Sequence, residues 1–163
     1  MMKIVFAFFF CSALMAADID GYWKSINETT GKPQCVVAVY EYEDLHYGRI
    51  VGTFDANGVM TDTIHNPKSR APGIVGSPFY CGMDLIWGLD DAGSKFKGKI
   101  VDPEKGNVYN AELWTDNQDL IVRGKLLFFG RSQRWRPVSA SDFPKEFQMP
   151  DVSKFVPVIP KVN

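Results

Sequence analysis

The alternation of apolar and polar residues in short stretches that end in turns is the feature that most constrains this chain. In residues 95–100 the three lysines fall on one face of an extended strand, opposite Phe96, Gly98 and Ile100. Residues 120–126 alternate in the same way. No segment after the first 17 residues keeps an apolar stripe at helical spacing for three turns. The pattern predicts an all-β protein with antiparallel strands.

Eight strands of this kind follow one another along the chain. We expect them at Gly21–Asn27, Gln34–Tyr42, His46–Phe54, Phe79–Leu89, Ser94–Val101, Asn107–Thr115, Asp119–Leu126 and Arg131–Val138. Most of the links are of hairpin length and contain glycine, and glycines inside several strands supply the bends that a closing sheet needs. The series predicts an eight-stranded antiparallel up-and-down barrel.

One connection, from Asp55 to Pro78, is too long for a hairpin and holds three prolines. We expect it to cross one end of the barrel as a lid or Ω-loop.

The first 17 residues have the pattern of a secretory signal peptide. Lys3 is followed by an apolar run over residues 4–11 and by small residues before Asp18. The run is shorter than the roughly 18–20 residues that a transmembrane helix needs. We therefore expect cleavage after Ala16 or Ala17, no transmembrane anchor, and a mature protein that is periplasmic or secreted.

Composition limits the classes of partner. Lys and Arg number 18 and Asp and Glu 19, which gives a formal net charge of −1. Without a basic surface, nucleic-acid binding is not expected. Hydrophobic residues make up 45 %, enough for one folded domain, which we place at residues 18–138. Half of the ten prolines lie between Pro137 and Pro160, so residues 139–163 are expected to form an extended Pro-rich tail. Packing of the tail on the barrel is favoured over a docking strand for a protein partner.

Two cysteines, Cys35 and Cys81, remain after the expected cleavage. An exported chain allows a disulfide between them. The strand assignment separates them by roughly 9–10 Å, beyond the limit of about 7 Å for bridging unless one strand is displaced. The alternative is a pair of apolar core thiols.

Several motifs keep the order and spacing of a known family. They are Gly21-Tyr22-Trp23-Lys24, Leu45-His46-Tyr47-Gly48-Arg49-Ile50-Val51, residues 66–76, residues 99–109, Leu120-Ile121-Val122-Arg123-Gly124 and residues 129–136. From about Asp20 to Val138 the chain resembles the exported bacterial family called domain of unknown function 2147. The resemblance implies a lipocalin-like barrel. It implies no activity and no catalytic residues.

A structural contact is expected where the barrel closes. Trp23 lies on the first strand, and Arg134 and Arg136 flank Trp135 on the last. Because the first and last strands of a closed barrel are neighbours, we expect one of these arginines to lie across the Trp23 ring in a cation–π contact.

Catalytic and metal-binding patterns are sparse. The chain has two histidines, His46 and His65, and lacks a Gly-x-Ser-x-Gly turn or His spacings typical of zinc sites. We therefore expect no catalysis, no metal and no cofactor; an enzyme using a histidine and arginines at the barrel mouth is the weakest alternative. Four arginines could together form an anion-binding rim, although each is individually typical of a solvated strand: Arg49, Arg70, Arg123 and Arg131.

An eight-stranded barrel either fills its interior with its own side chains or holds one small ligand. Aromatic and apolar strand residues that could line an apolar cavity, or fill it, are Tyr40, Tyr42, Phe79, Met83, Leu85, Trp87 and Trp114. The sequence therefore predicts non-catalytic binding of a small apolar or amphipathic ligand. The alternative is a ligand-free envelope or secreted interaction module acting through its loops and tail.

Overall fold

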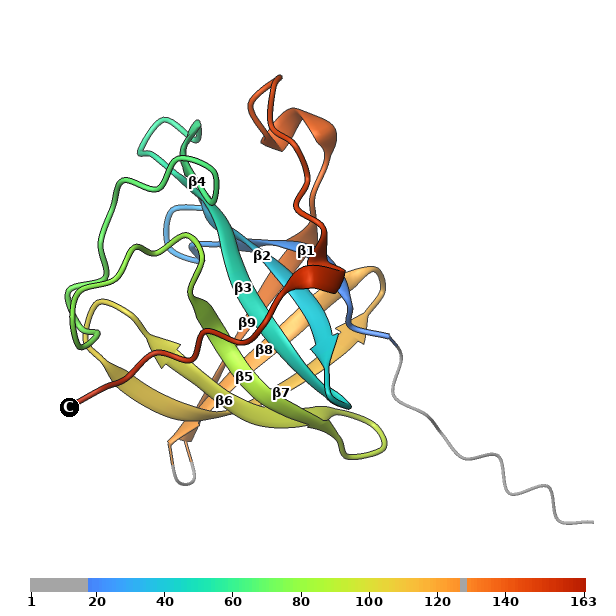
Figure 1. Cartoon of the computed structure of the whole chain (residues 1–163). Coiled ribbons are helices and arrows are strands. Elements are labelled where there is room, and N and C mark those ends of the chain that lie inside the picture. The colour runs from blue at the N-terminus through green and yellow to red at the C-terminus, as the bar shows by residue number, and fades with distance from the viewer. Residues whose placement is uncertain (1–17, 127–128) are drawn as a thin grey trace, which may run out of the picture.

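A computed structural model describes residues 18–126 and 129–163, and these residues form an antiparallel β-structure (Figure 1). The strands are β1 (Gly21–Ile26), β2 (Pro33–Tyr42), β3 (Leu45–Phe54), β4 (Met60–Thr63), β5 (Asp84–Asp91), β6 (Phe96–Asp102), β7 (Asn107–Asp116), β8 (Asp119–Leu126) and β9 (Phe129–Pro137). Two short 3-10 helices, η1 (Ala140–Asp142) and η2 (Val152–Lys154), lie in the tail. Seven of the eight expected strands begin and end within two residues of these bounds.

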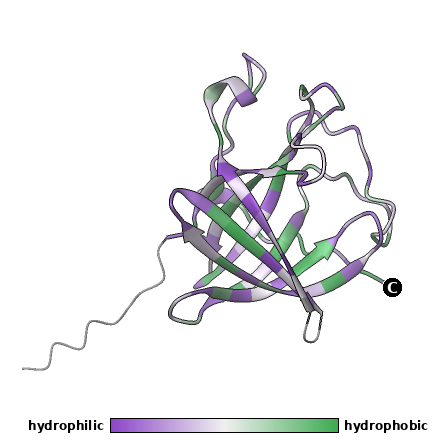
Figure 2. Ribbon diagram, turned by 180° about the vertical axis from the view of Figure 1, so that it is seen from behind, coloured by the Kyte–Doolittle hydropathy of each residue, from purple (hydrophilic) through white to green (hydrophobic). Residues whose placement is uncertain are grey.

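The sheet closes on itself, which confirms the expected barrel. Its strand order is β2-β1-β9-β8-β7-β6-β5-β3, and a further pairing of β2 with β3 completes the ring of eight strands. The remaining strand, β4, pairs with β3 alone and extends the barrel wall at one end. Figure 2 shows hydrophobic and hydrophilic bands along the strands, as expected where one face meets a core and the other meets solvent.

The connection between β3 and β5 differs from the sequence prediction. The strand expected from Phe79 begins only at Asp84, because Gly82 has a φ of 100° that interrupts an extended backbone. Before it, the short strand β4 was missed. Ala71, Ile74 and Cys81 are buried in the barrel core, so this connection forms part of the wall and rim and is not a free flap.

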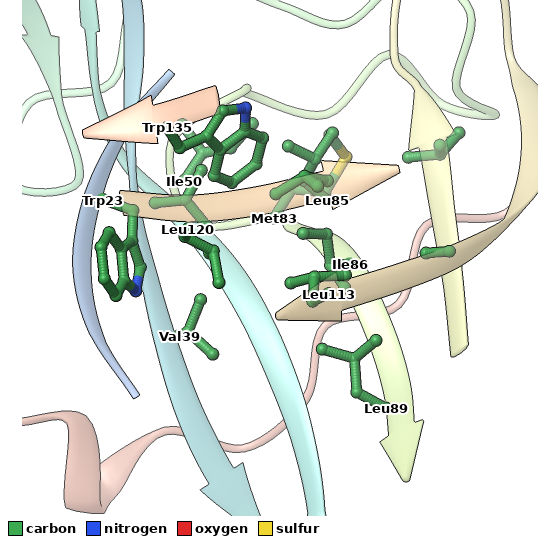
Figure 3. Packing of buried hydrophobic residues seen from close by; sticks show 14 of the residues in the cluster. Trp23, Val39, Ile50, Met83, Leu85, Ile86, Leu89, Leu113, Leu120 and Trp135 are labelled. Atoms are coloured by element: carbon green, nitrogen blue, oxygen red, sulfur yellow. The ribbon is translucent and has the colours of Figure 1, made fainter. Parts of the chain in front are cut away.

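The two ends of the barrel differ. At the closed end, which carries the β2–β3, β5–β6 and β7–β8 turns, large side chains fill the interior (Figure 3). Ile19, just before β1, has no exposed surface and plugs this end, and its carbonyl accepts a 2.9 Å hydrogen bond from Trp23 Nε1. The opposite end, which carries the β1–β2 and β6–β7 connections, is called the open end below.

The closure between the first and last strands is partial. β1 and β9 are neighbours, as expected, but only Trp23–Pro137 and Lys24–Arg136 are in register, both toward the closed end. The expected cation–π contact is wrong. Arg134 points outward and binds Asp116 and Asp119, and Arg136 is exposed. Residues 134 and 136 face the opposite side of β9 from the buried Trp135, so neither can reach Trp23 inside the barrel.

The tail lies against the outer face of β2 and β3 (Figure 1, red). There Phe143 and Phe155 pack over the apolar residues Val36, Ala38 and Val51. Beside them a buried ion pair joins Arg49 Nη2 to Asp84 Oδ2 at 2.9 Å. Arg49 also donates to the carbonyl of Val156 in the tail, and the Asp84 carboxylate accepts from the amide of Val158. β2 is therefore buried on both faces.

Among the helices of the described residues, none has the length and apolar character needed to cross a membrane.

Candidate ligand-binding cavity

A cavity of about 1000 Å³ occupies the open end of the barrel. On β1 and β8 the inward side chains are large at the closed end and smaller here. On β8 the inward positions run from Leu120 through Val122 to Gly124, and on β1 from Trp23 to Ser25. The interior is thus packed at one end and hollow at the other.

The floor and one wall of the cavity are apolar. Ile50, Leu85 and Trp135 meet at the depth where the packed core begins, and Figure 3 shows them grouped at one level, with Val39 and Leu89 at the other end of the cluster. Ile100 on β6 and Tyr109 on β7, which are partners in the sheet, continue this wall toward the mouth.

The wall formed by β1, β2 and β9 is polar. Ser25 Oγ accepts a hydrogen bond from the Cys35 amide, and it lies 3.2 Å from Cys35 Sγ. Burial raises the pKa of the Cys35 thiol to about 11, with the Ser25 contact acting in the opposite direction, so the thiol is neutral. On β9, Gln133 Oε1 accepts a 3.0 Å hydrogen bond from Trp135 Nε1.

Charged side chains stand at the mouth. Arg131 on β9 lies 3.4 Å from Glu28 in the turn after β1, and Lys32 Nζ donates to the Ala56 carbonyl. Glu104 also borders the cavity. The pKa of Tyr80 on this rim is raised, mainly by burial and secondly by the negative charge of Glu104.

Of the seven residues expected to line a cavity, the structure places only Leu85 on it. Met83 is buried in the barrel core, and Trp87 packs partly against that core. Tyr40 is buried outside the barrel, where its hydroxyl donates to Asp84. The others also lie away from the cavity: Tyr42 contacts Tyr47 edge-on, Arg70 covers the Phe79 ring, and Lys95 covers the Trp114 ring.

The prediction of the lining residues failed because of features of β2 and β5. Val36–Tyr40 is apolar at every position, so alternation could not show which face is inward, and the tail buries the outer one. An irregularity of pairing between Trp87 and Asp90 shifts the alternation in β5. Sequence reasoning missed apolar lining residues such as Ile50 and Ile100, and polar ones such as Ser25 and Gln133. The polar ones were missed because an apolar lining was expected.

The four arginines do not form one rim. Arg49 is buried with Asp84 under the tail, Arg70 lies over Phe79, and Arg123 follows the outward alternation of β8. Only Arg131 borders the cavity. The expected anion-binding cluster is therefore wrong.

The cysteines and histidines have separate environments. Cys35 and Cys81 are both free thiols. The pKa of the Cys81 thiol is raised, mainly by burial and secondly by the negative charge of Asp62. His46 Nδ1 contacts Asp20 at the closed end, and His65 Nε2 contacts the Gln148 carbonyl beneath the tail, so the structure places both histidines away from the cavity.

An eight-stranded antiparallel barrel with a ligand-sized hollow at one end defines a lipocalin-like protein. The chain belongs to the family described as "Uncharacterized protein conserved in bacteria (DUF2147)", whose model matches residues 21–136. This confirms the resemblance found in the sequence.

A solved structure with a similar fold is that of protein HP1028 from Helicobacter pylori, described as belonging to the lipocalin family. The two share 16 % identity with a TM-score of 0.60, over 77 % of this chain and 86 % of that one. At this identity the likeness shows the fold alone. No curated protein matches the chain.

Proposed function

We propose that this protein binds a small apolar or amphipathic molecule in the barrel, without catalysis. The observation that carries the proposal is the cavity of about 1000 Å³. Ligand sites are commonly hollows of roughly 300–1,000 Å³ with a mostly apolar lining and a few polar groups. A barrel built only as a scaffold would have no reason to leave its interior unfilled at one end.

The lining supports a specific orientation. Ile50, Leu85 and Trp135 offer apolar surface at the floor, where removal of a hydrocarbon from water is favourable. Lys32 and Arg131 stand at the mouth, where a polar or anionic headgroup of the ligand would stay in contact with solvent. The ligand would enter through the open end with its apolar part leading.

Export is part of the proposal. Residues 1–17, the expected signal peptide, lie outside the described residues. Ile19 is fully buried as the plug of the closed end, so cleavage after Ala17 would leave that plug in place. N-terminal sequencing of the mature protein tests this, and an intact Met1 would contradict it.

The decisive experiment is mass spectrometry of an organic extract of the mature protein, purified from its native host in folded form. A lipid or other apolar molecule in stoichiometric amount supports the proposal and names its ligand class. An empty extract from folded protein contradicts it.

One observation favours a second candidate, an interaction module. Val156, Val158 and Ile159 in the tail are each about half exposed, which is unusual for three large apolar residues so close in sequence. A pull-down from envelope extract with Val156→Ser/Val158→Ser, compared with wild type, tests it. Equal recovery of every partner would exclude this role for the tail.

A further inference from the structure

The side-chain amide of Gln133 has a fixed orientation. Trp135 Nε1 lies 3.0 Å from Gln133 Oε1. An indole N–H can only donate, so the group that faces it must be the carbonyl oxygen of Gln133. The amide nitrogen, with two N–H donors, is therefore turned away from Trp135. Within residues 18–126 and 129–163 no side chain or carbonyl accepts a hydrogen bond from this nitrogen.

Gln133 is partly exposed and lies between the floor of the cavity and its mouth. It borders the cavity and is paired across the sheet with Val122, which is 3 % exposed. Two residues toward the floor on β9 is Trp135, which is 2 % exposed. Two residues toward the mouth is Arg131, whose side chain is 74 % exposed. The donors of Gln133 thus stand one layer above the floor.

Part of the opposite wall is apolar. There the cavity is bordered by Leu85 on β5 and Ile100 on β6. On the polar side Ser25 and the amide of Cys35 already satisfy each other. Gln133 therefore offers a ligand two N–H donors beside the apolar floor, and no described residue uses them.

We propose that the ligand carries a hydrogen-bond-accepting oxygen, such as a carbonyl, near its buried end, one layer above the floor, where the Gln133 amide donates to it. The inference rests on the proposed function and narrows it, since a plain hydrocarbon chain would leave two donors unsatisfied. A site built to donate a hydrogen bond discriminates against an analogue that lacks the acceptor.

Two probes of equal chain length test this directly: dodecanoate, and 11-oxododecanoate, which has a ketone one carbon from the buried end. Their affinities are measured by isothermal titration calorimetry on delipidated, folded protein. We expect wild type to bind the ketone about tenfold more tightly, the size of effect that one such hydrogen bond produces.

Two substitutions distinguish hydrogen-bond donation by the Gln133 amide from an effect of side-chain packing. Gln133→Glu keeps an acceptor for Trp135 Nε1 but removes both donors, and Gln133→Leu removes the polar group altogether. Both should abolish the preference for the ketone. Ser132→Ala, on the opposite face of the same strand, should retain it. Thermal melting confirms that each variant is folded.

The outcomes are distinct. Equal or tighter binding of dodecanoate by wild type, or a ketone preference that persists in both Gln133 variants, overturns the inference and leaves ligand binding intact. Failure of the folded protein to bind either probe, together with an empty organic extract, overturns the proposed function and the inference with it.

Discussion

The closed and open ends of this barrel are built from the same strands but have opposite interiors. On β1 the inward side chain changes from Trp23 to Ser25, and on β8 it changes from Leu120 to Gly124. The backbone pairing of β8 with β7 and β9 continues through both ends. Every second residue of a strand faces the interior, so the sizes of these side chains decide where a closed barrel is hollow. The cavity needs no break in the strands.

The ends also differ in how the first and last strands meet. β1 and β9 pair at Trp23 and Lys24, toward the closed end, while β8 and β9 pair at seven positions. The closed end thus combines a filled core with the two residue pairs that join β1 to β9. The open end has a hollow interior and a seam between β1 and β9, bridged by Glu28 and Arg131. Stability should concentrate at the closed end and binding at the open end.

The largest effect is expected from a cavity made at the closed end. Leu113 has no exposed surface, so Leu113→Ala should lower the free energy of unfolding by about 2–5 kcal/mol. Urea denaturation followed by tryptophan fluorescence measures this. Val59→Ala, at a residue that is 56 % exposed, is the control and should stay within about 0.5 kcal/mol of wild type. A loss below about 1 kcal/mol for Leu113→Ala would mean that the closed end is not the packed region.

The second-largest effect, a loss of ligand binding, is expected from filling the cavity at the open end. A Cβ on Gly124 would make ordinary contacts with Ile100 and Tyr109, and the added side chain would enter the cavity. Gly124→Leu should therefore remain folded and weaken binding of the extracted ligand at least about tenfold, equivalent to about 1.4 kcal/mol. Calorimetry measures it, with the melting temperature as the check on folding.

Gly98→Leu is the matched comparison on a nearby strand. A Cβ there would lie 2.7 Å from the Trp87 carbonyl oxygen, so backbone would have to move. This variant should lose stability, whereas Gly124→Leu should lose binding. The same result for both would remove the distinction between hollow and packed positions.

The barrel itself was predictable because alternation and turn glycines are local signals. β4 was missed because four residues carry too little pattern, and the start of β5 was misplaced because the φ of 100° at Gly82 ends the extended backbone. The outward position of Arg134 and Arg136 could have been found. They flank the inward Trp135, and successive strand residues face opposite sides.

The cavity was not predictable in the same way. Tyr40 sits in an apolar run that is buried on both faces, and only the packed tail reveals that it points outward. Whether an interior position is filled depends on neighbours from several strands, such as Ser25 and Gly124, that are distant in sequence. Long-range packing, and not local pattern, decides where the hollow lies.

A smaller, pH-dependent effect is expected at the closed end. The Asp20 carboxylate, by hydrogen bonding, raises the pKa of His46, partly opposed by burial. Protonated His46 therefore stabilises the folded state fully below its unfolded pKa of about 6.5. This stabilisation is lost as pH rises through the raised pKa. The pair is partly exposed, so we expect less than about 1 kcal/mol. Asp20→Asn should remove this pH dependence in urea melts between pH 5 and 9, and a variant with an unchanged profile would contradict the assignment.

The smallest effect is expected at the seam of the open end. Arg131 and Glu28 have side chains that are 74 % and 43 % exposed, so solvent screens their attraction. Arg131→Ala should change the free energy of unfolding by less than about 0.5 kcal/mol. On β1, nearer the closed end, Lys24 lies 2.7 Å from Asp142 and is better shielded. Lys24→Ala should therefore cost more, up to about 1 kcal/mol. Paired urea melts at low and high salt compare the two. If Arg131→Ala proved the more destabilising, the ion pair across the seam, and not the filled closed end, would be what holds the first and last strands together.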